Sequence, residues 1–354
     1  MHFDHGQVPA AYRRYIGWKI ALIVLLALLL LLALVVAVGL GASRLGPGEV
    51  ALSLIGRAPS KQVAMIVWNI RLPQALATLV AGAGLAAAGA VMQSILRNPL
   101  GSPFTLGISH AAAFGAAFAV MILGGGVMTS SGAITSTIPA LTTLGALVCS
   151  LAAAGVIIAV SRLRGANPEV MVLTGVALGA LCTAATMFLQ YFASDVQLAA
   201  MVFWTFGDTA RASWSELGLM AAVTGVCSLY FLANSWNYNA IDAGDETARG
   251  LGVHVDRVRL LGMFLASLVT AVLTAFLGII GFVGLVVPHM LRRLLGADHR
   301  FLLPASLLLG GLLLLVSDTV ARLLLAPRVL PVSVLTAFLG APVFLALIVR
   351  GRRP

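Results

Sequence analysis

Apolar runs of about 20 residues recur along the whole chain, separated by short polar segments. A helix of this length crosses the hydrocarbon core of a bilayer and satisfies its own backbone hydrogen bonds. The composition agrees, because 60% of the residues are hydrophobic and 10% are charged, whereas roughly 25% are charged in a soluble domain. The sequence therefore predicts an all-α polytopic membrane protein and excludes a water-soluble fold.

We expect about ten transmembrane helices. Their predicted ranges are 20–41, 72–93, 104–123, 138–161, 170–192, 214–233, 260–277, 281–297, 301–324 and 331–350. The first run is too long for a signal-peptide core, so it is read as a span after a cytoplasmic N-terminus, 1–19. One transmembrane domain, 20–350, and a cytoplasmic tail, 351–354, follow. This orientation places 15 of the 22 Lys and Arg residues inside and 7 outside, as the positive-inside rule requires.

The join between the second and third predicted spans reads Arg97-Asn98-Pro99-Leu100-Gly101-Ser102-Pro103. Its two prolines prevent one continuous helix, and its arginine and asparagine are costly in hydrocarbon. The join therefore predicts a tight, water-facing turn between two Gly/Ala-rich helices that can pack closely. In the predicted topology this turn is cytoplasmic, as are the loops 162–169 and 234–259. A polar turn that closes a path between helices suits a transporter gate.

The chain lacks the motifs of an energy-converting or catalytic site. The only lysines are Lys19 and Lys61, so no P-loop is present, and neither H-E-x-x-H nor a serine-nucleophile elbow occurs. Cys149, Cys182 and Cys227 have no metal-ligand spacing. The net charge of +10 comes from basic residues at span ends, which argues against nucleic-acid binding. We expect no metal or cofactor on this chain, and we expect its energy to come from a partner.

The loop 234–259 is a candidate docking segment. Its stretch from Asn239 to Gly252 contains acids typical of a helix start and a glycine typical of a helix end. It predicts a short amphipathic helix that fits a groove on a cytoplasmic subunit. An ordinary interfacial connector is the alternative.

A weak internal echo accompanies these features. Gly89 and Pro99 are ten residues apart near the end of the second predicted span, and Gly278 and Pro288 repeat that spacing near the seventh. The two spans run in opposite directions in the predicted topology. The spacing is compatible with an inverted repeat and also with chance.

Several motifs resemble the FecCD family, the permease subunits of ABC importers for ferric siderophores, haem and vitamin B12. The motifs are Arg71-Leu72-Pro73, Gly82, Gly89, Gln93, Asn98-Pro99-Leu100, Pro103, Leu106-Gly107, Gly244–Gly252, Gly278–Arg292, Asp318–Arg322, Leu330-Pro331 and Leu339–Phe344. The resemblance covers about residues 20 to 350. It implies a type II ABC importer permease fold in a cytoplasmic (inner) membrane. It also implies a second permease subunit, identical or paralogous, two ABC ATPase subunits that bind ATP and Mg, and an extracytoplasmic solute-binding protein.

The resemblance also implies roles for particular residues. Asn98 and Leu100 match one cytoplasmic gate, and Asn167, Pro168 and Glu169 fall at a second, where the family often has small hydroxyl residues. The ATPase-coupling loop corresponds to Gly244, Asp245, Glu246, Ala248, Arg249 and Gly252. Arg71 and Arg322 match outward arginines that pair with acids of the binding protein. A further arginine, common three residues after the first, is replaced here by Gln74.

Other roles keep two interpretations. Arg322 follows Asp318 by one helical turn, so a local ion pair is the alternative to docking. His110 either faces the pathway, where it would touch an iron chelate or haem, or packs as a hydrogen-bonded histidine.

The resemblance places the pathway between the fifth and tenth spans of paired subunits, although small residues also form helix contacts. Further candidate lining residues are Thr174, Gly175, Thr183, Thr186, Ser333 and Thr336.

The resulting hypothesis is the permease of a binding-protein-dependent ABC importer for a metal chelate. Ferric siderophore is the leading cargo, and haem, vitamin B12 and molybdate-like oxyanions are the alternatives. Two different classes of function compete with it, namely an ion-coupled secondary transporter and an intramembrane enzyme. The scarcity of acids within the spans and the missing catalytic motifs count against both.

Overall fold

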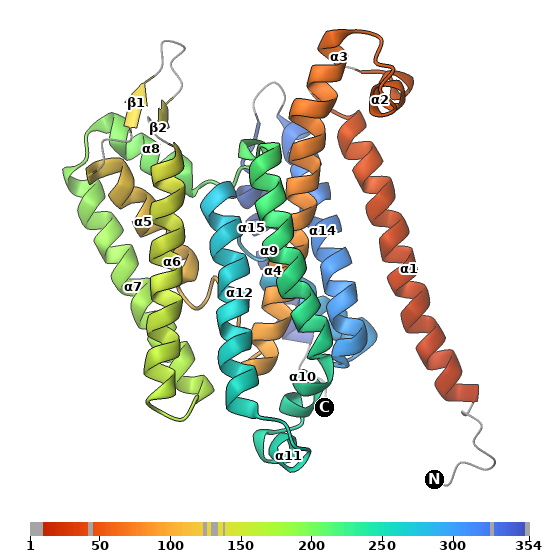
Figure 1. Cartoon of the computed structure of the whole chain (residues 1–354), viewed down its shortest axis with the longest axis vertical. Helices are drawn as coiled ribbons and strands as arrows, with labels where there is room; N and C mark the ends of the chain where they lie inside the picture. Colours follow the sequence, from red (N-terminus) through yellow and green to blue (C-terminus); the bar gives the residue numbers. More distant parts are fainter. Residues whose placement is uncertain are drawn as a thin grey trace.

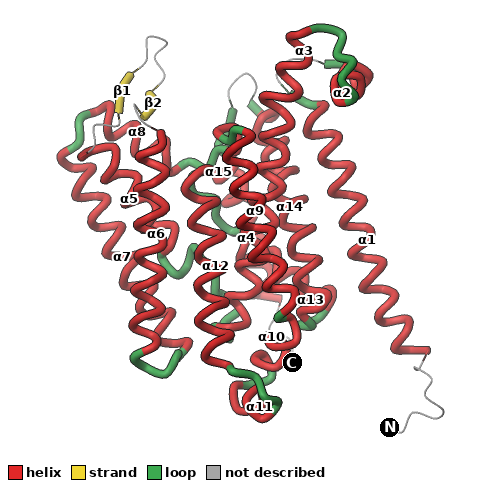
Figure 2. Tube along the Cα trace, viewed as in Figure 1, coloured by secondary structure: helices red, strands yellow, loops and turns green. Residues whose placement is uncertain are grey.

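The computed structural model describes residues 10–41, 45–122, 126–128, 134–136, 139–325 and 329–350. It is a bundle whose long helices run roughly side by side between two ends of the molecule (Figure 1). Besides one antiparallel pair of strands, β1 (Gly126–Met128) and β2 (Ile134–Ser136), the regular structure in these residues is helical (Figure 2). The first nine residues and the predicted tail, 351–354, lie outside the described residues.

Each of the ten predicted spans contains a helix. These helices are α1 (Ala10–Gly39), α4 (Leu72–Ile95), α5 (Ile108–Ile122), α6 (Pro139–Arg162), α7 (Pro168–Phe192), α9 (Trp214–Ala233), α12 (Val255–Leu277), α13 (Val283–Leu295), α14 (His299–Leu324) and α15 (Val332–Arg350). Within the described part of the chain, seven helices are long and apolar enough to cross a membrane. The predicted all-helical membrane fold is confirmed.

Three of the predicted spans hold helices outside these seven, namely α5, α13 and α15, and the first two are much shorter than a full crossing. Helix α5 has 15 residues and α13 has 13, and at 1.5 Å per residue neither reaches the roughly 30 Å of a hydrocarbon core. Helix α13 starts late because Gly278 ends α12 with φ 79° and Phe282 has φ 67°. Helix α1 instead starts ten residues before its predicted span, and it encloses Lys19, whose side chain lies over the ring of Tyr15.

Helix α4 forms the centre of the larger group of helices, and most of its residues are buried. Glycines allow its backbone to approach two neighbours. A Cβ at Gly82 would overlap the carbonyl of Gly310 in α14, and a Cβ at Gly89 would overlap that of Gly284 in α13. The Gly/Ala-rich composition of this span therefore serves close helix packing, as predicted.

A second group, α5 to α7 with α8 (Asp195–Thr205), lies beside the first (Figure 1). Gly115 of α5 packs directly against Gly145 of α6. Gly175 of α7 packs against the backbone of Leu106, just before α5. The contact of Gly175, and that of Gly179 with Gly107, agree with the helix contacts expected from small residues in α7.

Short helices occupy the two ends of the bundle. One end, here called the α3 end, carries α2 (Pro47–Leu54) and α3 (Lys61–Met65), which continues through the π-helical turn Ile66–Arg71 into α4 (Figure 1). The opposite end, here called the α11 end, carries α10 (Ser235–Asp242) and α11 (Asp245–Gly250). The predicted short helix in loop 234–259 is thus present as two short helices. The sequence had not predicted α2, α3 or α8.

The glycine–proline echo falls on different local structures. Gly89 lies within α4, whereas Gly278 ends α12. Pro99 lies in the turn after α4, whereas Pro288 lies inside α13. The inverted repeat therefore stays a prediction without support from this spacing.

Candidate functional site

The predicted turn after α4 is present and is here called the Asn98 turn (97–103); its first half is exposed, whereas residues 101–103 are buried. The Asn98 side-chain oxygen accepts a hydrogen bond from the Leu100 N–H at 2.9 Å, and Arg97 has φ 48°. Helix α5 begins at Ile108, later than predicted, because Ser102 and Thr105 bond each other in a turn before it. Arg97 and Leu100 are exposed.

A second exposed turn, here called the Asn167 turn (163–167), precedes α7. Asn167 caps this helix, its side-chain oxygen accepting from the Glu169 N–H at 2.8 Å. The two turns meet at a hollow of about 690 Å³ at the α11 end. The residues that line it are Leu96, Arg97, Asn98, Asn167, Pro168, Glu169, Val172, Leu173 and Asp245. The fold thus brings together most of the predicted gate residues and one predicted coupling residue.

The predicted coupling residues form α11 and its flanks. Gly244 turns the chain with φ 118°, and Asp245 and Glu246 occupy the first turn of the helix. Ala248 is fully buried, and the exposed Arg249 forms an ion pair with Asp256 at 3.4 Å. After the helix, Gly252 adopts φ 83°.

Sequence reasoning missed Arg259 as a site residue. It lies near the start of α12. From the sequence it is recognised only as one of the basic residues on the predicted cytoplasmic side. Its side chain is 1% exposed and forms an ion pair with Asp245 at 2.8 Å. It also donates to the carbonyl of Ile95, just before the Asn98 turn, and to that of Ala166, within the Asn167 turn. The available signal was an arginine next to a long apolar run, which does not reveal its partners.

Sequence reasoning also missed Asp242, the last residue of α10. Its carboxylate accepts from Ser94 Oγ of α4 at 2.7 Å, and lies 3.1 Å from both Arg292 Nη1 and His299 Nε2. Burial alone would raise the pKa of Asp242, but the hydrogen bonds from His299 and Ser94 and the charge of Arg292 lower it below its usual range. The carboxylate therefore stays charged and holds α10 to α4, α13 and α14.

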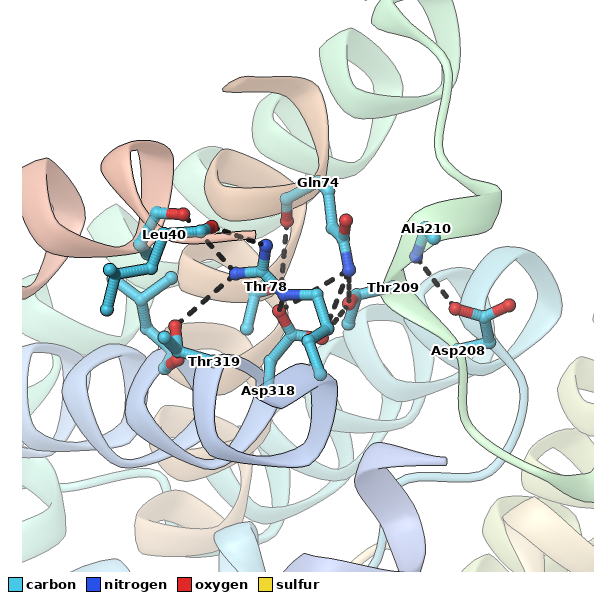
Figure 3. Close-up of polar contacts among 11 residues, drawn as sticks. Leu40, Gln74, Thr78, Asp208, Thr209, Ala210, Asp318 and Thr319 are labelled. Atoms are coloured by element: carbon cyan, nitrogen blue, oxygen red, sulfur yellow. Dashed lines mark hydrogen bonds and ion pairs between the residues drawn. The ribbon is translucent and has the colours of Figure 1, made fainter. Parts of the chain in front are cut away.

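A polar cluster lies near the α3 end (Figure 3). The Asp318 carboxylate accepts from Thr209 Oγ1 at 2.6 Å and from Gln74 Nε2 at 3.3 Å. Arg322 Nε lies 3.0 Å from the same carboxylate. The local ion pair considered for Arg322 is therefore present, and Gln74, which stands where an arginine is common, binds within the chain.

Arg71 lies close to this cluster and is 4% exposed. Its guanidinium donates to the carbonyls of Val38 and Gly39, at 3.1 and 2.8 Å. In this arrangement neither Arg71 nor Arg322 projects outward as the family resemblance implied, because both donate to carbonyls near the end of α1. Their docking role stays a prediction that would need these contacts to open.

The predicted pathway residues fall in two places. His110, Gly175 and Thr183 line a groove of about 490 Å³ between α5 and α7. Thr183 and Thr186 donate to carbonyls of their own helix, and Thr174, also in α7, is half-buried. Ser333 and Thr336 lie apart from this groove in α15, where Ser333 accepts from the Gly207 N–H at 3.1 Å and Thr336 is buried. The structure therefore brings His110, Gly175 and Thr183 together in the groove, and Ser333 and Thr336 together elsewhere, where the Thr336 hydroxyl donates to the Ser333 carbonyl at 3.0 Å.

The His110 ring contacts that of Phe104 in a tilted arrangement, with ring centroids 5.3 Å apart. Among the described contacts its Nδ1 atom has no hydrogen-bond partner, so the hydrogen-bonded packing role is not seen. Within the described residues, no group of three or more His, Cys, Asp or Glu side chains could hold a metal ion.

The chain is similar to known proteins over most of its length. The FecCD transport family model matches residues 28–350. Methanocaldococcus jannaschii MJ0087, named provisionally as an ABC transporter permease, is 50% identical over 97% of this chain and 98% of its own. The Yersinia pestis hemin transport system permease HmuU is 37% identical over 96% of both chains. A solved inward-facing structure, described as a metal-chelate type ABC transporter, has TM-score 0.79 and 31% identity, covering 93% of this chain and 98% of that one.

Two further relatives are named for other cargo. The Fe(3+)-citrate import permease YfmE of Bacillus subtilis is 33% identical over 92% of this chain and 94% of its own length. The vitamin B12 import permease BtuC of Salmonella typhi is 37% identical over 96% of this chain and 97% of its own length.

The bundle of membrane-length helices is the fold of a multi-pass membrane protein, and the named relatives make its class a transporter permease. The family model matches residues 28–350, which include almost all the spans, and this match identifies the family. The chain belongs to the FecCD transport family and is a multi-pass permease of the ABC importer type.

Proposed function

We propose that this chain is the membrane subunit of a binding-protein-dependent importer that moves a metal chelate, with ferric siderophore as the cargo, into the cytoplasm. The family match over residues 28–350 is the observation that carries the proposal. The named relatives support the metal-chelate class, because haem, Fe(3+)-citrate and vitamin B12 are all metal complexes. Haem and vitamin B12 are therefore the competing cargoes.

The chain itself makes and breaks no covalent bond in this proposal. Two ABC ATPase subunits bind ATP and Mg and dock against α10 and α11. The α11 end and both termini then lie on the cytoplasmic side of an inner membrane. A solute-binding protein delivers the cargo at the α3 end. ATP binding then repositions α11 and alternates access at the Asn98 and Asn167 turns.

A second permease subunit, identical or paralogous, would complete the pathway against α7 and α15. Helix α7 supports this, because it presents large exposed apolar side chains. Leu173, Leu181, Met187, Phe188 and Tyr191 are 69%, 64%, 62%, 65% and 82% exposed. Lipid covers any part of this face that the partner leaves free.

Uptake in a strain that lacks the chain tests the proposal. Radiolabelled ferrichrome, haem and cyanocobalamin are supplied separately, and the chain is then restored. We expect loss and rescue of the ferrichrome signal, and expect ATP depletion to abolish it. Loss of only haem or cobalamin uptake would replace the cargo and keep the importer. Uptake that survives ATP depletion but collapses with an uncoupler would instead indicate an ion-coupled carrier.

A further inference from the structure

Arg259 connects three segments that are far apart in the sequence. Its Nη2 atom donates to both carboxylate oxygens of Asp245, at 2.8 and 3.0 Å, in the first turn of α11. Its Nε atom donates to the Ile95 carbonyl at 2.8 Å, at the end of α4. Its Nη1 atom donates to the Ala166 carbonyl at 3.2 Å, within the Asn167 turn. One side chain thus connects α11 to the residue that ends α4, before the Asn98 turn, and to the Asn167 turn.

The chemistry of the guanidinium makes this junction rigid. Its donors form a planar fork, so the three acceptors keep fixed relative positions while all three bonds hold. The side chain is 1% exposed, so water cannot replace a lost partner, and an unpaired charge there would be costly. If α11 moves, the bonded carbonyls keep their hydrogen bonds only by moving with it, and losing these bonds would leave a buried charge without partners.

A neighbouring contact strengthens the same connection. Asp242, at the end of α10, accepts from Ser94, the residue before Ile95. The end of α4 is therefore bonded at two adjacent residues, directly to α10 through Asp242 and to α11 through Arg259 of α12. The ion pair between Arg249 and Asp256 differs, because both side chains are about half-exposed, at 52% and 54%. Among the hydrogen bonds of the described residues, it does not extend to either turn.

We propose that Arg259 is the positioning residue that transmits movement of α11 to the Asn98 and Asn167 turns together. The inference rests on the proposed function, in which an ATPase moves α11. It adds the particular side chain that makes the two turns respond as one unit. A purely structural role would lower the yield of the complex but would leave the cargo moved per ATP unchanged.

The test uses the full permease–ATPase complex in proteoliposomes with the binding protein and radiolabelled ferrichrome, or haem if only haem supports uptake. The variants are Arg259→Gln, which removes the charge, and the milder Asp245→Asn, which keeps the shape of the acceptor. Asp256→Asn is the matched control, because it breaks the exposed ion pair nearby. Complex yield, ATP hydrolysis and cargo moved per ATP are measured together.

We expect both variants to assemble and hydrolyse ATP while cargo moved per ATP falls about tenfold, within the usual range of coupling between sites. Asp256→Asn should keep the normal ratio. An unchanged ratio in Asp245→Asn would overturn the inference, even if Arg259→Gln failed to assemble. Failure of both variants to assemble, with Asp256→Asn intact, would assign Arg259 a structural role only and would also overturn it.

Spin labels supply a readout independent of transport. They are placed at the exposed Leu163 and Leu251, on the Asn167 turn and after α11, with the three native cysteines replaced. We expect this distance to stay narrow with and without nucleotide in the unaltered complex, and to broaden and become nucleotide-dependent in Arg259→Gln. A distance that ignores the Arg259 substitution would contradict the inference. An unaltered complex that binds no ATPase would instead overturn the proposed function itself.

Discussion

Three aspartates near the α11 end hold segments that are distant in the sequence, and each does so through hydrogen bonds to its carboxylate. Asp242 binds Ser94 and contacts two basic side chains, and Asp245 binds Arg259. Asp298 caps α14 and accepts from Asn239 Nδ2 at 2.9 Å and from Arg300 Nη2 at 2.7 Å. Charged acceptors form stronger hydrogen bonds than neutral ones, so these carboxylates stabilise the short helices around the hollow.

Asp298 gives a pH-dependent prediction. Burial alone would raise its pKa, but the hydrogen bonds from Arg300 and Asn239 lower it to about 2. A carboxylate with a lowered pKa stabilises the folded state fully above its unfolded pKa of about 4, and this contribution is lost as the pH falls toward 2. Asn also caps helices, so Asp298→Asn isolates the charge.

We expect Asp298→Asn to reduce the free energy of unfolding at pH 7 by about 1 kcal/mol or less, because the ion pair is partly exposed. Roughly half of that difference should disappear at pH 3. Unfolding of both proteins in detergent at pH 7, 4 and 3 measures it. Equal differences at all three values would show that the charge contributes nothing.

At the scale of elements, backbone contacts between glycines place α4 against its neighbours. Gly82 and Gly89 have no room for a side chain, because a Cβ there would overlap the backbone of α14 and of α13 respectively. Alpha-helices in membranes gain little from the hydrophobic effect between them, so close van der Waals packing is a main source of their association. These glycines therefore fix where the Asn98 turn emerges from α4.

We expect Gly89→Ala to destabilise the protein by about 1–3 kcal/mol or more, because the added methyl group meets backbone that cannot move aside. Gly218→Ala in α9 is the matched control, since nothing lies within 4 Å of a Cβ there. The control should be neutral or stabilising by about 0.5–1 kcal/mol, as alanine is the better helix former. Thermal unfolding in detergent compares them. A Gly89→Ala protein as stable as the control would refute the close packing.

At the scale of the whole molecule, the two ends of the bundle carry different features. The α11 end carries the hollow, both turns and the short helices that we assign to the ATPase. The α3 end carries α2, α3 and the Asp318 cluster, which ties α4, α14 and the turn after α8 together. An importer needs such a division, because energy and cargo arrive from opposite sides of the membrane.

Gly252→Pro tests the docking end. Proline requires φ near −65°, whereas Gly252 has φ 83° and donates its N–H to the Arg249 carbonyl at 3.0 Å. We expect the variant to insert into the membrane but to lose ATPase association. Gly56→Pro is the matched control at the α3 end, because Gly56 has φ 78° and a similar N–H bond to Ser53. It should bind the ATPase normally. Copurification decides, and a normal yield for Gly252→Pro would exclude docking at this loop.

Local signals in the sequence determined a large part of this protein. Run length predicted the helices, the prolines and polar residues predicted the Asn98 turn, and helix-start acids with a terminal glycine predicted α11. Each of these signals acts through residues a few positions apart, where backbone sterics and burial decide the outcome. The motifs of the second gate also fell beside the hollow that the fold forms.

Only the tertiary structure decided which of these segments act together. Arg259 bonds to residues 164 and 93 positions earlier in the chain, and Asp242 to one 148 positions earlier. Arg71 turned out to be buried because carbonyls near the end of α1 lie beside it. A long side chain has the same sequence signature whether it projects into solvent or satisfies distant carbonyls, and only the packing of helices brings those acceptors within hydrogen-bond distance.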